Sequence, residues 1–83
     1  MGKAMNYRER IVRSAGIVAG EPVFKGTRVT LRTVLASLAE GATTAEILSD
    51  FPTLSEEDVR AAIAFAAASA QEDLPLAESP INR

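Results

Sequence analysis

The pattern of apolar and polar residues changes near residue 30. Before it, apolar residues come in runs of two or three that are separated by glycines, which is typical of short strands joined by tight turns. After it, apolar residues recur at spacings of three and four, as on amphipathic helices. We therefore expect a mainly α protein with short N-terminal β-strands.

The N-terminal part predicts two or three short strands. The runs at 10–13 and 22–25 hold β-branched and aromatic residues, and a shorter run, Gly16-Ile17-Val18, lies between them. Hairpins of this length are barely stable alone. They need a helical layer, or strands of another subunit, to pack against.

The first two predicted helices span 31–40 and 44–51. Thr30 is placed to cap the first helix and Gly41 to end it, while Thr43 and Glu46 have the spacing of a capping box for the second. The residues expected to point inward are Leu31, Val34, Leu35, Leu38, Ile47, Leu48 and Phe51. Pro52 ends the second helix.

The third predicted helix spans 56–73. Ser55 and Asp58 repeat the capping-box spacing, and Leu54 and Val59 have the spacing of a hydrophobic staple. A short helix, a turn at 52–54 and a longer helix together make a helix-turn-helix. We expect one domain over 7–73, a disordered start at 1–6 and a flexible tail at 74–83.

The composition leaves little volume for a core. Of 39 apolar residues among 83, 15 are alanine, and a chain of this length is marginally stable by itself. The third helix is apolar on nearly opposite sides, and Phe65 would be exposed without a partner. We therefore expect a homodimer, although an alanine-rich helix with exposed methyl groups remains the alternative. The expected interface consists of Val59, Ile63, Phe65, Ala66 and Ala70.

The net charge of −2 conceals two unlike halves. Residues 1–35 hold seven cations and two anions, net +5, and residues 36–83 hold two cations and nine anions, net −7. This division suggests two different partners or head-to-tail association, and sorted surface charge is the alternative. The cations expected to contact nucleic acid are Arg8, Arg10, Arg13, Lys25, Arg28 and Arg32. Each could instead solubilise the surface or pair with the acidic half of a neighbouring subunit.

The usual docking of a helix-turn-helix on DNA is disfavoured by its charge. The start of the second helix of the motif normally enters the major groove. Here that position holds Glu56, Glu57 and Asp58, which phosphates repel. If DNA is bound, the basic N-terminal half is the better surface.

The missing residue types argue against catalysis and cofactors. Without cysteine and histidine there is no disulfide, thiol nucleophile, imidazole base or zinc finger, and no metal site is expected. The segment 20–28 lacks the spacing of a phosphate-binding loop. The longest apolar run, 61–68, is too short to span a membrane. We expect a cytoplasmic binding protein with no small-molecule substrate.

Several short strings, in order, carry a resemblance to a known family. The N-terminal strings are Arg10-Ile11-Val12, Gly16-Ile17, Gly20-Glu21-Pro22-Val23 and Gly26-Thr27-Arg28-Val29. The helical strings are Leu38-Ala39-Glu40-Gly41, Glu46-Ile47-Leu48, Phe51-Pro52-Thr53-Leu54 and Glu57-Asp58-Val59-Arg60-Ala61-Ala62. Over about 9–68, the chain resembles domain-of-unknown-function family 433.

The resemblance implies a homeodomain-like three-helix bundle that is usually dimeric. It also implies an antitoxin role, in which the protein neutralises a PIN-like ribonuclease and represses its own operon by binding operator DNA. Two alternatives remain open. One is a DNA-binding regulator with no toxin, and the other is a dimeric adaptor whose basic half meets the acidic half of a second copy.

Overall fold

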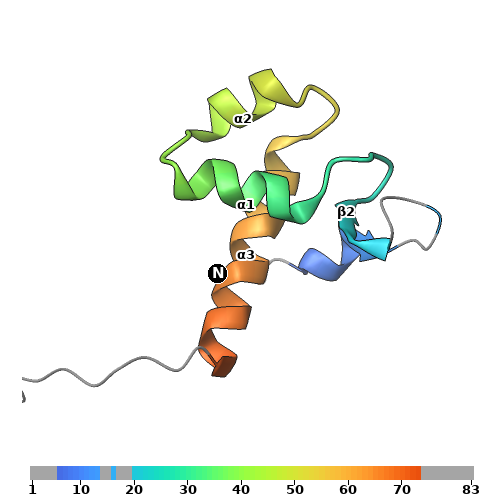
Figure 1. Cartoon of the computed structure of the whole chain (residues 1–83), viewed down its shortest axis with the longest axis vertical. Helices are drawn as coiled ribbons and strands as arrows, with labels where there is room; N and C mark the ends of the chain where they lie inside the picture. The colour runs from blue at the N-terminus through green and yellow to red at the C-terminus, as the bar shows by residue number, and fades with distance from the viewer. Residues whose placement is uncertain (1–5, 14–15, 17–19, 74–83) are drawn as a thin grey trace, which may run out of the picture.

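Three helices and a two-stranded sheet make up the fold in a computed structural model that describes residues 6–13, 16 and 20–73 (Figure 1). The elements are η1 (Tyr7–Glu9, a 3-10 helix), β1 (Ile11–Arg13), β2 (Pro22–Phe24), α1 (Leu31–Ala39), α2 (Thr44–Asp50) and α3 (Glu56–Asp73). The predicted fold class is confirmed. The expected start at 1–6, apart from Asn6, the tail at 74–83 and the run at 17–18 lie outside the described residues.

The two strands form an antiparallel hairpin that packs on the helices. Ile11 pairs with Phe24 and Val12 with Val23, and the amide of Lys25 donates to the carbonyl of Arg10 over 2.7 Å. β2 contacts α1, while β1 contacts α3. The helical layer that so short a hairpin requires is therefore present within the same chain.

The core lies where β2 meets the three helices. Its buried members are Phe24, Leu31, Val34, Ile47, Leu54, Val59 and Ala62. Both residues of the expected hydrophobic staple, Leu54 and Val59, belong to it. The apolar stripes of the helices thus converge on one side chain of the sheet, Phe24, which is fully buried.

Hydrogen bonds at the helix starts follow the sequence signals. The Thr30 hydroxyl accepts from the amide of Thr33, and Thr43 and Glu46 form a complete capping box. The limits of the three helices and two strands lie within one residue of those predicted. Local side-chain chemistry therefore sets where each helix begins.

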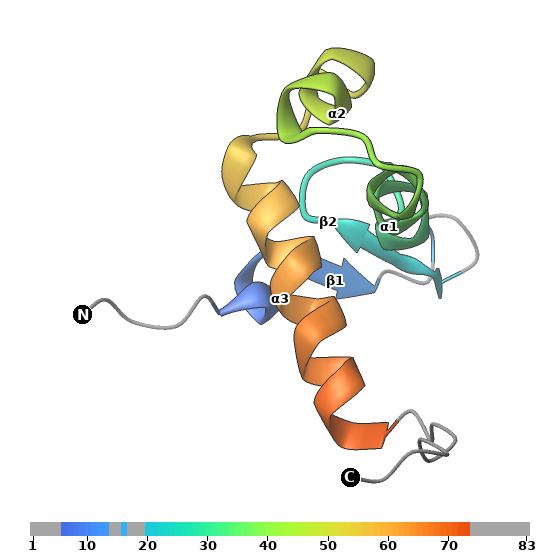
Figure 2. The same cartoon turned by 90° about the vertical axis from the view of Figure 1, so that its left-hand side faces the viewer.

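The longest helix, α3, extends past the rest of the described chain. In both views its last turns lie beyond α1, α2 and the hairpin (Figures 1 and 2). η1 and β1 lie against its first half. None of the helices in the described ranges has the length and apolar character needed to cross a membrane.

Candidate functional site

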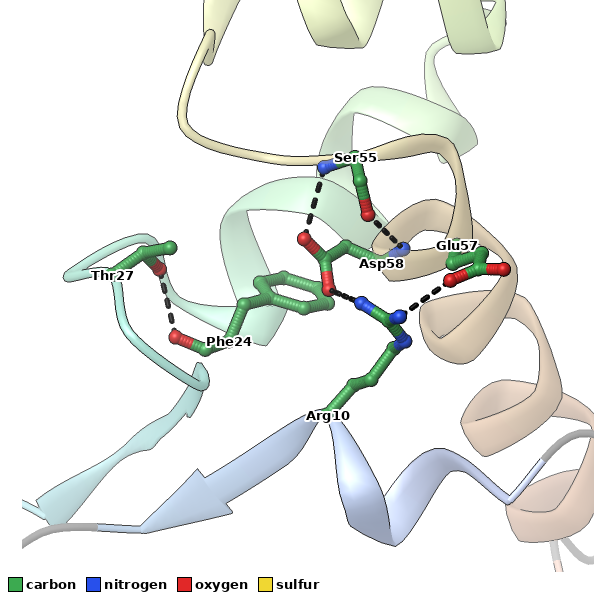
Figure 3. Close-up of polar contacts among 6 residues, drawn as sticks. All are labelled: Arg10, Phe24, Thr27, Ser55, Glu57 and Asp58. Atoms are coloured by element: carbon green, nitrogen blue, oxygen red, sulfur yellow. Dashed lines mark hydrogen bonds and ion pairs between the residues drawn. The ribbon is translucent and has the colours of Figure 1, made fainter.

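Arg10 joins the N-terminal segment to the start of α3 (Figure 3). Its Nη1 donates to Oδ1 of Asp58 over 3.1 Å, and its Nη2 pairs with Oε1 of Glu57. Arg10 retains 36% of its side-chain exposure and Asp58 only 10%. One guanidinium thus bridges two consecutive carboxylates at the N-terminus of a helix.

Asp58 also caps the helix that carries it. Its Oδ2 accepts from the amide of Ser55 over 2.9 Å, and Oγ of Ser55 accepts from the amide of Asp58 over 3.3 Å. The two carboxylate oxygens therefore have separate partners, one in the cap and one in Arg10. The negative charge of Asp58 also interacts favourably with the positive end of the helix dipole.

An aromatic pair lies two turns farther along α3. The ring of Tyr7, in η1, meets the ring of Phe65 edge to face, with 5.4 Å between centroids and 82° between planes. Phe65 also packs against the core. The segment Asn6–Arg10 thereby contacts α3 through an aromatic ring at one end and a guanidinium at the other.

An open pocket of about 280 Å³ lies beside the ion pair. Glu9, Arg10, Lys25 and Asp58 line it. The two carboxylates and two cations leave little net charge, and Arg10 and Asp58 already bind one another. Elsewhere in the described ranges, too, no three side chains group into a metal site.

Four of the six cations that we expected to contact nucleic acid have contacts within the chain. Besides Arg10, Arg32 pairs with Glu21 over 3.0 Å, and Arg13 donates to the carbonyl of Gly20 over 3.1 Å. Arg8 lies over the Tyr7 ring, 5.3 Å from its centroid. Lys25 and Arg28 are exposed and pair with no carboxylate in the described part of the chain.

The expected interface residues of α3 also separate into two groups. Val59 is 1% exposed and belongs to the core. Phe65 is half-buried, because it packs against the core and its ring meets that of Tyr7 of the same chain, so it is not stranded as we expected. The other three residues lie nearer the surface: Ile63 is 49% exposed, Ala66 is half-buried and Ala70 is exposed. Dimerisation through α3 stays a prediction that now rests on these three.

The segment Asn6–Arg10 was missed as an element by the sequence reasoning. Asn6 caps η1 by accepting from the amide of Arg8 over 3.1 Å, and its side-chain amide donates to Glu9 over 3.4 Å. An asparagine followed three residues later by a glutamate was the available signal. This pair of residues lies at the boundary between the expected disordered start and the domain.

Comparison with known proteins identifies the family. The sequence model of the family described as "Protein of unknown function (DUF433)" matches residues 11–66, more than half of the chain. The chain is 39% identical over 62 residues to "Uncharacterized protein y4eO" of Sinorhizobium fredii, covering 75% of this chain but only 28% of that protein.

A crystal structure shows the same fold. It is that of a DUF433 member protein from Anabaena variabilis, with a TM-score of 0.66 and 27% sequence identity, and the similarity covers 76% of this chain and 62% of that one. The family model thus confirms the resemblance seen in the sequence, and the crystal structure confirms the three-helix fold. The chain belongs to the DUF433 family.

Proposed function

We propose that this domain is a binding module of the antitoxin type, which neutralises a PIN-like ribonuclease by occupying its RNA-binding surface. On this proposal the chain catalyses nothing and acts in the cytoplasm as a homodimer. The same dimer represses its own operon where operator DNA is available to it.

The observation that carries the proposal is the charge of the helical half. Between Arg32 and Arg60 the chain has no cation, and it has six carboxylates: Glu40, Glu46, Asp50, Glu56, Glu57 and Asp58. Three of these occupy the first turn of α3, where a DNA-reading helix would meet phosphates. Asp58 is buried and bonded to Arg10, but the other five carboxylates are exposed. A surface with these five charges suits a cationic protein better than a nucleic acid.

A ribonuclease provides a cationic surface for a general reason. Phosphates supply most of the affinity of nucleic-acid-binding proteins, so an RNA-cutting enzyme lines its groove with lysine and arginine. An acidic module that competes for this groove gains both attraction and fast association. The acidic helical half thus supports inhibition by competition with RNA.

The test is an RNA cleavage assay with the product of the adjacent gene. We expect a complex that survives gel filtration, and cleavage that falls to background once the two proteins are equimolar. An adjacent product that cuts RNA at an unchanged rate in the presence of this chain would overturn the proposal.

Operator binding is supported by a separate observation. Lys25 and Arg28 are exposed and unpaired within the described part of the chain, on the segment that joins β2 to α1. Both cations lie outside α3, away from its acidic first turn in the sequence. The double substitution Lys25→Glu/Arg28→Glu should abolish operator binding, measured by fluorescence anisotropy at low salt, and leave nuclease inhibition intact.

A further inference from the structure

We propose that the segment Asn6–Arg10 covers a second protein-binding site, and that a partner segment with an aromatic residue and an arginine displaces it. We call Asn6–Arg10 the cover segment. The site beneath it, the covered face of α3, consists of Glu57, Asp58 and Phe65. The inference relies on the proposed function only for the identity of the partner.

The covered face of α3 has the chemistry of an arginine site next to an aromatic site. Glu57 and Asp58 converge on one guanidinium, each accepting a charge-assisted hydrogen bond from a different Nη atom (Figure 3). Phe65 lies on the same side as Asp58, two turns or about 10 Å farther along the helix. Ala61 lies between them along the helix and is fully buried.

The cover segment shows which ligand fits. It offers a tyrosine three residues before an arginine, in a single 3-10 turn that its own Asn6 caps. A partner segment with the same spacing would meet the same two positions. The acidic charge of the site and its aromatic neighbour thus select a basic, aromatic-bearing peptide.

The cover segment is held weakly enough to be displaced. None of the residues of η1 is buried, whereas β1, which follows directly, is held by its ladder with β2. The segment is fixed to α3 by Tyr7 at one end and Arg10 at the other. Segments with few buried contacts open locally at much lower free energy than the whole domain.

The affinity of the covered face for a partner depends on how often the cover segment is open. A site that is open only part of the time binds with an apparent Kd raised by the inverse of the open fraction. Arginines from the RNA-binding groove of a ribonuclease would compete directly with Arg10. The cover therefore excludes weakly basic proteins and yields to a strongly basic one.

The test adds the cover segment to the protein as a separate peptide. The probe is a synthetic peptide with the sequence of residues 6–13, and the receptor is the full chain carrying Tyr7→Ala/Arg10→Ala. Peptide-induced NMR shifts of the amides of Glu57, Asp58 and Phe65 should be saturable, with a Kd at least tenfold lower than for the unchanged chain. A peptide in which Tyr7 and Arg10 are both alanine should not bind.

Two further variants make the result specific. Adding Glu57→Lys to the receptor should remove peptide binding, whereas a chain with only Arg8→Ala should keep the cover closed and behave like the unchanged chain. Equal binding to the open and the unchanged chain, or none to the open chain, would overturn the proposal. The assay contains no ribonuclease, so its failure is distinct from failure of the antitoxin proposal.

Hydrogen exchange on the unchanged chain provides a test that does not depend on a variant folding. The amide of Arg10 donates to the carbonyl of Tyr7 over 2.9 Å, so its exchange reports opening of η1. Its protection factor should be at least tenfold lower than that of the buried Ala62 in α3. Equal protection at the two amides would show that the cover opens only when the domain unfolds.

Discussion

Asp58 has more structural contacts than any other carboxylate at the start of α3. It exchanges hydrogen bonds with Ser55 and accepts one from Arg10, while Glu56, two residues earlier, has only a 4.0 Å contact with Arg60. Both residues are acidic and lie in the first turn. Asp58 is buried and hydrogen-bonded whereas Glu56 is exposed, so substituting the two residues should change the free energy of unfolding by very different amounts.

We expect Asp58→Ala to lower the free energy of unfolding by about 2–3 kcal/mol. The change removes the acceptor for the amide of Ser55, which is half of the capping box, and a charge-assisted hydrogen bond to Arg10. Glu56→Ala is the matched control and should change stability by less than about 0.5 kcal/mol, because exposed ion pairs contribute little. Urea denaturation measures both. Equal losses would mean that the bonds of Asp58 do not stabilise the fold.

Sequence reasoning at the residue scale predicted the caps and missed the long-range contacts. Thr30, Thr43 and Ser55 were identified because a capping residue and its target lie within three positions. The partners of Arg10 lie 47 and 48 residues away, and Tyr7 lies even farther along the chain from Phe65. No local pattern indicates which carboxylate an arginine meets across the fold.

At the scale of elements, the turn between α1 and α2 depends on the backbone of one glycine. Gly41 has φ +94°, and a Cβ built there would meet no atom within 4 Å. Gly16 has the same open surroundings without a left-handed φ. Substituting Gly41 and Gly16 by alanine therefore tests the effect of backbone strain alone, because neither new side chain would overlap with other atoms.

Gly41→Ala should destabilise the domain by about 1 kcal/mol or more, because an L-residue is strained in this conformation. Gly16→Ala, the control, should be neutral or slightly stabilising. Thermal unfolding monitored by circular dichroism would show the first variant several degrees below the second. Indistinguishable midpoints would contradict the role assigned to Gly41.

The helices and strands were predictable as elements, since each is specified by its own apolar spacing and end signals. η1 was not, because a single 3-10 turn has too few residues for periodicity. Its position depends on what it contacts in α3. Of the candidate site, the sequence indicated the acidic first turn of α3. It did not indicate that Asn6–Arg10 lies on this helix.

At the scale of the whole molecule, the exposed end of α3 bears on the oligomeric state. Ile63 is 49% exposed, and among the described residues it is the large apolar side chain left at the surface. Ala66 and Ala70 lie on the same side of the helix, which extends past the bundle in Figure 2. Small residues there would allow a second copy of α3 to approach closely.

Ile63→Lys should convert the proposed dimer to a monomer without reducing the stability of the monomer, because the side chain is outside the core. Sedimentation equilibrium would show at least a tenfold rise in the dimer dissociation constant. Ser69→Lys, which is also exposed on α3 but about a third of a turn away from Ile63, serves as the control for the added charge. A variant that dimerises like the unchanged chain would remove α3 from the interface.

On the proposed antitoxin role, the distribution of charge over the molecule decides which surface a ribonuclease would meet. The most direct measurement is the affinity of the chain for the product of the adjacent gene, by isothermal titration, with the charge of either half reversed. Asp50→Lys/Glu56→Lys should weaken binding at least tenfold, because both carboxylates are exposed on the acidic helical half. Lys25→Glu/Arg28→Glu should leave binding unchanged. Loss of binding in the second variant, with the first unaffected, would contradict the account.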